Sequence, residues 1–391
     1  MAAENRPGID GKFYASPSSP AELEAWLNAT FITSSADSWQ SLWHNLVKTR
    51  QMTMYYLPKA GQLFIQGEHC ILDGRGIVNF WDRFFRALGS PLPLQELMRT
   101  DGSDIARLPP RSDDLLDTSE SRPGRGEQRA HEILAPFGAM TAPITMPVAS
   151  PLPPRSDKNG AMVFKATRRA TDAIRAQCKT QRLSVTAAWH AAVVLATQSI
   201  QAEHGAAGTQ FATFGNFDVR RYFPRPSSQP GSYDYALGNH HCVLPYIVTA
   251  SKGRTLPQLA RELGAFYQRD LAKSDPEVWS ALGPMVRILV PDFVKEQLDE
   301  TTPAVSSFGV LDDFISHEYP GGWAIEDLWL GDTVTGPWLE HFMWSWKGQL
   351  WFNTCYNPAY YKKEDVDRFN RTVLDRMMSG LGATGRPDEK L

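Results

Sequence analysis

A histidine precedes an aspartate and a glycine at a fixed spacing in the stretch EHCILDG, residues 68–74. His69 belongs to the residue type that titrates nearest to neutral pH, which suits it to act as a general base. Such a base could remove the proton from a substrate hydroxyl as that hydroxyl attacks a carbonyl, a gain on the order of 10²- to 10⁴-fold in rate. The stretch is therefore a candidate for acid–base catalysis.

A strand and a helix are expected on either side of this motif. The segment QLFIQGEHC is typical of a strand, which would place Leu63, Ile65, Gly67 and His69 on one face. After Asp73, apolar residues recur with the period of a helix, namely Ile77, Phe80, Trp81, Phe84, Phe85 and Leu88. The histidine would then be oriented at the end of a strand, immediately before that helix.

Asp73 permits two interpretations. In one, its carboxylate turns back toward the backbone or an arginine and braces the loop, while Gly74 permits a tight conformation. In the other, Asp73 is only the N-cap of the helix, and His69 is a hydrogen-bonded core histidine. The residues alone leave both interpretations open.

The composition limits the classes of function. With 42% hydrophobic residues, a chain of 391 residues can bury a large core, and we expect a mixed α/β fold. A net charge of −3 without long basic runs argues against nucleic acid as a partner. The absence of a signal sequence and of an apolar run of about 18 residues predicts a soluble, cytoplasmic protein with no membrane partner. The cysteines are scattered singly, so we expect reduced thiols.

A linker is predicted between about residues 100 and 158, where Pro, Ser, Asp and Arg dominate and a packed element is hard to place. The linker is the last part of a predicted N-terminal lobe, residues 1–158, and a predicted C-terminal lobe comprises residues 159–391. In the second lobe, Thr171 and Ser184 could cap two helices, of which the latter is apolar nearly all round. Later segments predict a helix over 256–272, a hairpin turning at Lys347-Gly348 and a last amphipathic helix.

Other residues are weaker candidates. Trp344 and Trp346 could touch a lipophilic substrate, although aromatic hairpin residues more often pack in a core. Ser306 and Ser307 could donate to an oxyanion, but a strand-edge serine pair is the simpler interpretation. His241, with its neighbours His240 and Cys242, lacks a third ligand at a suitable spacing, so no metal site is expected.

The motif resembles the His-x-x-x-Asp-Gly signature of the acyltransferase superfamily that includes chloramphenicol acetyltransferase, plant BAHD acyltransferases and the condensation domains of peptide synthetases. NFDVRRYFPRP is similar to the mid-chain Asn/Asp-x-Arg segment of that superfamily, and LGNHHCVLPY to the Gly-Asn strand after it, which makes Asn239 and His241 candidate substrate-binding residues. VSSFGVLDDFI and the segment from LWLGDTVTG to NPAYY look most like the fungal trichothecene 15-O-acetyltransferase branch. The resemblance runs from about residue 12 to 382.

The resemblance implies two chloramphenicol-acetyltransferase-like lobes with an active-site tunnel between them, which acyl-CoA and the alcohol enter from opposite sides. His69 would be the general base and Asp73 a structural carboxylate paired with Arg220. Three features depart from the pattern. Roughly eighty or more residues that usually come first in the family are missing, so the N-terminal lobe is expected to be short; Glu68 replaces the second histidine of condensation domains; and SSFGVLDDF replaces the Asp-Phe-Gly-Trp-Gly signature of plant members.

These features together predict a CoA-dependent O-acyltransferase, in the first instance an acetyltransferase, that acts on a hydroxyl of a terpenoid or polyketide. Acyl-CoA, preferably acetyl-CoA, would be its co-substrate, with no bound cofactor and no metal, and the protein is expected to be a monomer. One alternative is the same fold used by a cyclase, pericyclase or dehydratase without acyl transfer. The other is a binding subunit with no catalytic activity.

Overall fold

The computed structural model describes residues 2–5, 12–15, 17–49, 51–93, 108–149, 152–225, 235–294 and 301–384. The chain forms two compact units, and each is assembled from three segments. Unit 1 comprises residues 1–115, 218–241 and 313–326, and unit 2 comprises residues 116–217, 242–312 and 327–391. Both units mix helices with strands, so the predicted α/β class is confirmed. Both also draw on each side of the predicted linker, and the lobe boundary at residue 158 stays a prediction.

Unit 1 contains a three-stranded sheet in the order β3 (Phe31–Thr33), β4 (Thr53–Leu57) and β5 (Gln62–Gln66). β3 is parallel and β5 antiparallel to β4. The remaining elements are short apart from two helices; they are β1 (Ala2–Asn5), β2 (Lys12–Ala15), α1 (Pro20–Thr30), α2 (Trp39–His44), α3 (Gly74–Gly89), α5 (Ser112–Leu115), η2 (Val219–Tyr222), β10 (Glu318–Tyr319), η4 (Pro320–Gly322) and β11 (Trp323–Ala324).

Helix α3 is the element that carries the motif, and a segment distant in sequence holds it. Asp82 on α3 accepts a hydrogen bond of 2.7 Å from the Tyr319 hydroxyl, and the Tyr319 ring stacks on Phe85 at 5.5 Å. At the end of α3, a Cβ on Gly89 would lie only 2.1 Å from the Pro320 carbonyl oxygen. The backbones of α3 and η4 therefore approach each other as closely as a glycine allows.

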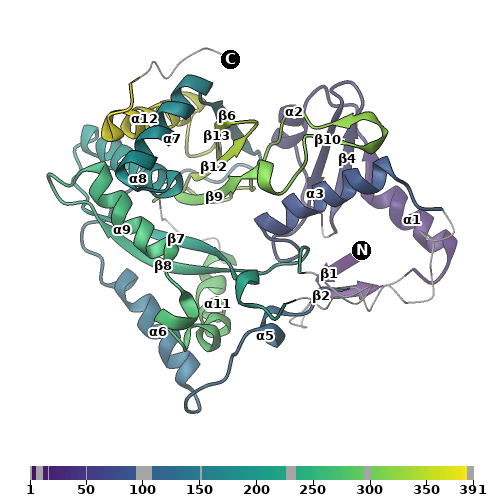
Figure 1. The fold of residues 1–391 in the computed structure, drawn as a ribbon, viewed down its shortest axis with the longest axis horizontal. Coiled ribbons are helices and arrows are strands. Elements are labelled where there is room, and N and C mark those ends of the chain that lie inside the picture. Colours follow the sequence, from purple (N-terminus) through teal and green to yellow (C-terminus); the bar gives the residue numbers. More distant parts are fainter. Residues whose placement is uncertain are drawn as a thin grey trace. The chain divides into compact units, whose positions relative to one another are not determined.

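Unit 2 is built on a four-stranded sheet in the order β6 (Gly160–Lys165), β13 (Gln349–Tyr356), β12 (Glu340–Trp346) and β9 (Ala304–Val310), which run side by side in Figure 1. β9 runs parallel to β12, and the other two pairs are antiparallel. The predicted hairpin is present, with Lys347 and Gly348 at positive φ between β12 and β13, as a two-residue turn between twisted strands requires.

Helices and a second sheet complete unit 2. The sheet pairs β7 (Gln210–Asp218) with β8 (His241–Thr249). The helical elements are α6 (Arg125–Gly138), α7 (Arg168–Gln181), α8 (Val185–Glu203), α9 (Leu256–Gln268), α10 (Leu271–Ser274), α11 (Val278–Val294), α12 (Lys363–Leu381) and the short η3 (Leu311–Asp313). The expected helices at 256–272 and at the C-terminal end correspond to α9 and α12.

Helix α8 forms the centre of the core of unit 2. Its apolar residues point in all directions, and it packs against α9 and α12. Ser184 caps it as predicted, because its hydroxyl accepts the Ala187 N–H. Thr167 rather than Thr171 caps α7. Thr171 is buried inside α7, where its hydroxyl accepts the Leu350 N–H at 3.1 Å.

Helix α6 lies within the predicted linker. The sequence made a packed element hard to place there, and the structure forms α6, whose Arg129 pairs with Asp275 at 2.8 Å. Tertiary contacts thus stabilise a charged helix that contains Pro136.

Within the described residues, no single helix is long and apolar enough to cross a membrane. Only α7 and α8 together, bent by 103°, pass that test of length and composition.

Candidate active site

His69 lies in the turn between β5 and α3, and not on the strand as the alternation predicted. β5 ends at Gln66, and the chain turns where the Ile71 N–H donates to the Glu68 carbonyl at 2.9 Å. The side chain of His69 is exposed. Its orientation therefore depends on contacts made by the turn and not on the pleat of the sheet.

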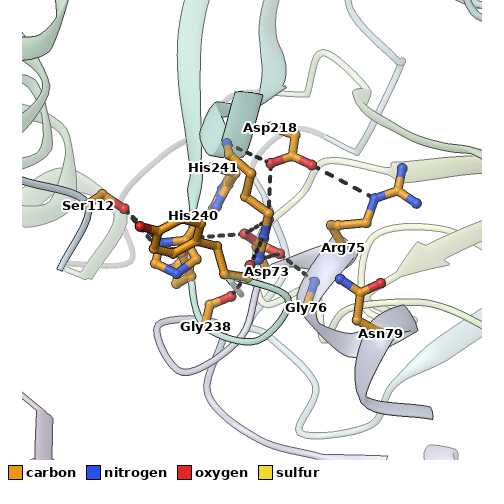
Figure 2. A network of polar contacts seen from close by, with 12 residues as sticks. Asp73, Arg75, Gly76, Asn79, Ser112, Asp218, Gly238, His240 and His241 are labelled. Carbon is orange, nitrogen blue, oxygen red and sulfur yellow. Dashed lines mark hydrogen bonds and ion pairs between the residues drawn. The ribbon is translucent and has the colours of Figure 1, made fainter. Parts of the chain in front are cut away.

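Asp73 is almost completely buried at the start of α3, with 2% of its surface exposed. Its Oδ1 accepts the Gly76 N–H at 2.6 Å, which makes it the helix N-cap, and its Oδ2 accepts the His240 N–H at 2.6 Å. Both oxygens also accept bonds from Arg220, at 3.1 and 2.9 Å (Figure 2 labels Asp73, Gly76 and His240). The two interpretations of Asp73 are therefore combined in one residue, which caps the helix and pairs with an arginine.

Arg220 uses all five of its N–H groups. Besides the two bonds to Asp73, Nε donates to the Tyr235 carbonyl at 2.5 Å, Nη1 to Asp218 at 3.1 Å and Nη2 to the Gly238 carbonyl at 3.1 Å. Burial by itself raises the pKa of Asp73, but the hydrogen bonds and the charge of Arg220, together with the two backbone N–H groups, outweigh it and lower the pKa. Asp73 is thus a carboxylate at neutral pH.

Sequence reasoning did not single out Arg75 and Asp218, which extend this network. Asp218 lies next to Arg220 and also forms an ion pair with Arg75 at 3.9 Å (Figure 2). The Arg75 guanidinium lies 3.2 Å from the centroid of the Phe314 ring, and burial lowers the pKa of Arg75. The Asp-x-Arg pattern was the signal for Asp218; no pattern in the sequence pointed to Phe314.

The segment before β8 forms the other side of the network. Gly238 has a φ of +108°, which only glycine adopts readily, and its carbonyl accepts bonds from Arg220 and from the Asp73 N–H. His240 follows, buried to 2% exposure, with its Nδ1 3.0 Å from the Ser112 hydroxyl (Figure 2). The next residue, His241, lies beside the turn that holds His69.

Asn239 and His241 contact the turn directly. The Asn239 Nδ2 donates to the His69 carbonyl at 3.1 Å, and the Asn239 Oδ1 lies 2.6 Å from the His241 Nδ1. The centroids of the His69 and His241 rings are 5.1 Å apart, with the ring planes tilted by 45°. Burial, and then the neighbouring His69, lower the pKa of His241 to about 4. His241 is therefore neutral at pH 7.

The candidate site residues predicted from the sequence lie partly in unit 1 and partly in unit 2. Unit 1 brings together His69, Asp73, Gly74, Arg220, Asn239 and His241. Unit 2 contains Ser306, Ser307, Trp344 and Trp346. The Ser307 hydroxyl is bonded to Thr186 of α8 at 3.0 Å, so Ser306, its neighbour on β9, lies on the opposite face of the sheet. Trp344 and Trp346 are at most 1% exposed, and the substrate contacts of all four residues stay a prediction.

No metal-binding group emerges from the described part of the chain, where no three His, Cys, Asp or Glu side chains converge suitably. The four cysteines are thiols that form no disulfide, and Cys178, Cys242 and Cys355 are buried. What the site offers chemically is an exposed imidazole beside a neutral one, on a turn anchored by a buried ion pair. That arrangement suits proton transfer at a hydroxyl.

The chain is similar to curated proteins, two of which are named acetyltransferases. No family model matches the chain. It is similar to the acetyltransferase pigO of Monascus ruber, with 25% identity over 371 residues that cover 93% of this chain and 79% of the relative. It is also similar to the O-acetyltransferase pigM of Monascus ruber, with 23% identity, 87% of this chain and 66% of the relative. A protein named for transcription, the loline biosynthesis cluster 1 transcription factor lolU1 of Epichloe uncinata, is 27% identical over 85% of this chain and 70% of its own length.

Among solved structures, the chain is similar to the TRI3 trichothecene 15-O-acetyltransferase from Fusarium sporotrichioides. The TM-score is 0.72 and the sequence identity 17%, over 94% of this chain and 80% of the other. At this identity the likeness shows the fold, which is the two-lobed fold expected from the sequence.

Proposed function

We propose that the chain is an acyltransferase of the superfamily with the chloramphenicol acetyltransferase and condensation-domain fold, and that it transfers an acyl group from acyl-CoA to a hydroxyl of an apolar secondary metabolite. We propose acetyl-CoA as the donor, because two relatives are named acetyltransferases. The acceptor that we propose is a terpenoid or polyketide alcohol. Acyl-CoA would be a co-substrate that enters and leaves, with no resident cofactor.

The observation that carries the proposal is the arrangement around His69. An exposed imidazole stands on a turn whose far end, at Asp73, is fixed by a buried ion pair with Arg220. A flexible loop would lose much of the advantage of a positioned base, because small displacements of a catalytic group are costly. The carboxylate of Asp73 has all its bonding capacity directed to Arg220, Gly76 and His240, which supports a structural role for it and leaves the proton transfer to His69.

In the proposed reaction, His69 carries one proton from the acceptor hydroxyl to the sulfur of CoA. His69 accepts the proton of the acceptor hydroxyl as the oxygen attacks the thioester carbonyl. The tetrahedral intermediate then collapses, the carbon–sulfur bond breaks, and His69 returns the proton to the departing sulfur of CoA. The products are the ester and free CoA, and His69 is again neutral.

Thiol release tests the proposal. Purified protein given acetyl-CoA and a panel of hydroxylated terpenoids and polyketides should release free thiol in the presence of at least one alcohol, with the ester detected by mass spectrometry. His69→Ala should abolish this release. His44→Ala is the matched control, since His44 is an exposed histidine on α2 of the same unit. Equal rates for the His69→Ala variant and the unaltered protein would refute His69 as the base.

A further inference from the structure

Asn239 joins the backbone of His69 to the side chain of His241. Its amide nitrogen donates to the His69 carbonyl, and its amide oxygen faces the His241 Nδ1. A carbonyl can only accept a hydrogen bond, so the nitrogen of the Asn239 amide must point to His69 and the oxygen to His241. The His69 carbonyl therefore fixes the orientation of the Asn239 amide, and this orientation requires the His241 Nδ1 to act as a donor.

That role fixes the tautomer of His241. Because the Asn239 oxygen accepts, the His241 Nδ1 must carry a proton and donate it across the 2.6 Å contact. The neutral ring has only one N–H, so the His241 Nε2 carries a lone pair. It is the same ring whose centroid lies 5.1 Å from that of His69.

Burial, more than the charges around it, keeps His241 neutral. Four groups act on it electrostatically: His69 and Arg220 disfavour its protonation, whereas Asp73 and Asp218 favour it. Asp73 and Asp218 are already paired with Arg220, and His241 is itself removed from much of the solvent. Near neutral pH the ring of His241 is therefore neutral, and of the two facing imidazoles it is that of His69 which is exposed to solvent.

We propose that Asn239 and His241 are positioning residues for His69: Asn239 holds the backbone of His69 and the tautomer of His241, and the His241 Nε2 accepts a hydrogen bond from the protonated ring of His69. The inference rests on the proposed function, in which His69 is the base. The transferred proton moves from the hydroxyl to His69 and then to the thiolate, so His241 neither gains nor loses one. It stabilises the imidazolium that forms between these two steps.

Nuclear magnetic resonance tests the tautomer without any substrate. In the full chain labelled with ¹⁵N in its imidazoles, the signals of His69 and His241 can be assigned by comparison with His69→Gln and His241→Gln. His241 should carry its proton on Nδ1 at neutral pH and stay neutral down to about pH 4. An Nε2–H tautomer, or protonation near pH 6.5 as in an ordinary histidine, overturns the inference.

Kinetics test the effect on His69. Asn239→Asp removes the donor to the His69 carbonyl and places a carboxylate beside His241, so it should move the acid limb of the kcat/KM profile upward by about one pH unit. Asn45→Asp, an exposed change at the end of α2, is the matched control and should leave the profile unchanged.

Replacing His241 separates positioning from packing. His241→Phe keeps a ring but removes the acceptor, and kcat should fall on the order of tenfold or more, as for one lost hydrogen bond to a charged group. His241→Gln supplies an amide oxygen and should recover part of this loss; thermal unfolding checks that both variants fold. An unchanged kcat and pH profile in His241→Phe overturns the positioning role. Activity retained by His69→Ala would instead overturn the proposed function, while the tautomer measured by resonance would stand.

Discussion

Asp73 illustrates how one buried carboxylate can serve several partners at once. It accepts four hydrogen bonds, two from Arg220 and one each from the backbone N–H groups of Gly76 and His240. These donors come from the first turn of α3, from η2 and from the segment before β8. The carboxylate therefore ties three chain segments of unit 1 together, and removing its charge should affect all of them.

Asp73→Asn should lower the free energy of unfolding by about 3–5 kcal/mol, because it removes the buried counter-charge of the Arg220 guanidinium and leaves only Asp218, which is 43% exposed. Chemical denaturation at pH 7 measures this loss. Asp37→Asn is the control, since Asp37 pairs with Lys59 at 2.8 Å on the surface, where both side chains are more than half exposed, and it should unfold like the unaltered protein.

The stability lost in Asp73→Asn should depend on pH in a definite direction. The pKa of Asp73 is lower in the folded chain than the ordinary value of about 3.9, so its contribution to stability is complete above about pH 4 and is lost as the pH falls through the folded value. The difference in stability between Asp73→Asn and the unaltered protein should therefore be constant from about pH 7 to 5 and narrow below pH 4. A difference that grows on acidification would contradict the ion pair.

The element α3 places its restricted glycine at Gly76 and not at Gly74, where a tight conformation was expected. Gly74 is the first residue of α3 and has helical backbone, so the expected tight conformation is not located there. The restricted position is Gly76, where a Cβ would lie 2.7 Å from the Gly238 carbonyl oxygen and 3.2 Å from the Asp73 Oδ1. The close approach of α3 to the segment before β8 depends on Gly76.

Gly76→Ala should separate these two segments and destabilise unit 1. It should also lower kcat by a larger factor than it changes KM, because His69 lies on the adjoining turn. Gly138→Ala is a matched control: Gly138 ends helix α6, nothing lies within 4 Å of the position of a Cβ there, and alanine favours helix by up to about 1 kcal/mol over glycine. Thermal unfolding and thiol release measure both variants. If Gly76→Ala behaves like Gly138→Ala, the close approach is not important for the site.

Local patterns predicted the elements in which the chain's own periodicity decides the structure. The apolar stripes of α3, α9 and α12, the Ser184 cap of α8 and the hairpin turn all follow from residues close in sequence. Helix α6 was missed because its charged residues are stabilised by partners such as Asp275, which are distant in sequence. The contact between Asn239 and His69 joins residues 170 positions apart, so no local pattern could reveal it. The Asp73–Arg220 pairing was anticipated only through the family resemblance.

For the molecule as a whole, two buried histidines and one partly buried glutamate of unit 2 should govern how stability depends on pH. His190 and His341 are fully buried, and each donates or accepts through Nδ1 alone, with Tyr267 at 2.9 Å and Thr354 at 2.8 Å. Burial lowers the pKa of both histidines to about 3. Burial, and then the charge of Asp332, raise the pKa of Glu340 to about 8. These groups are neutral in the folded chain at pH values where the unfolded chain would ionise them.

The two histidines and Glu340 have opposite effects on the pH dependence of stability, so we expect a stability maximum near pH 6.5. Below that pH the unfolded chain protonates His190 and His341 while the folded chain does not, so stability should fall by about 1.4 kcal/mol per pH unit for each histidine. Above pH 6.5 the histidines no longer contribute, and stability should decline up to about pH 8, because folded Glu340 retains a proton that the unfolded chain releases. Between about pH 4.5 and 6.5 both act, and the two histidines outweigh the one carboxyl.

Chemical denaturation between pH 4.5 and 8.5 measures this curve, and two variants assign its limbs. His190→Gln should reduce the slope on the acid side, whereas His204→Gln, at an exposed histidine just after α8, should leave it unchanged. Glu340→Gln should flatten the alkaline side, because a glutamine is neutral in both states, and Glu364→Gln on the surface of α12 should not. Stability that is level from pH 5 to 8 in the unaltered protein would mean that these buried groups ionise within the folded chain, and that water reaches the core of unit 2.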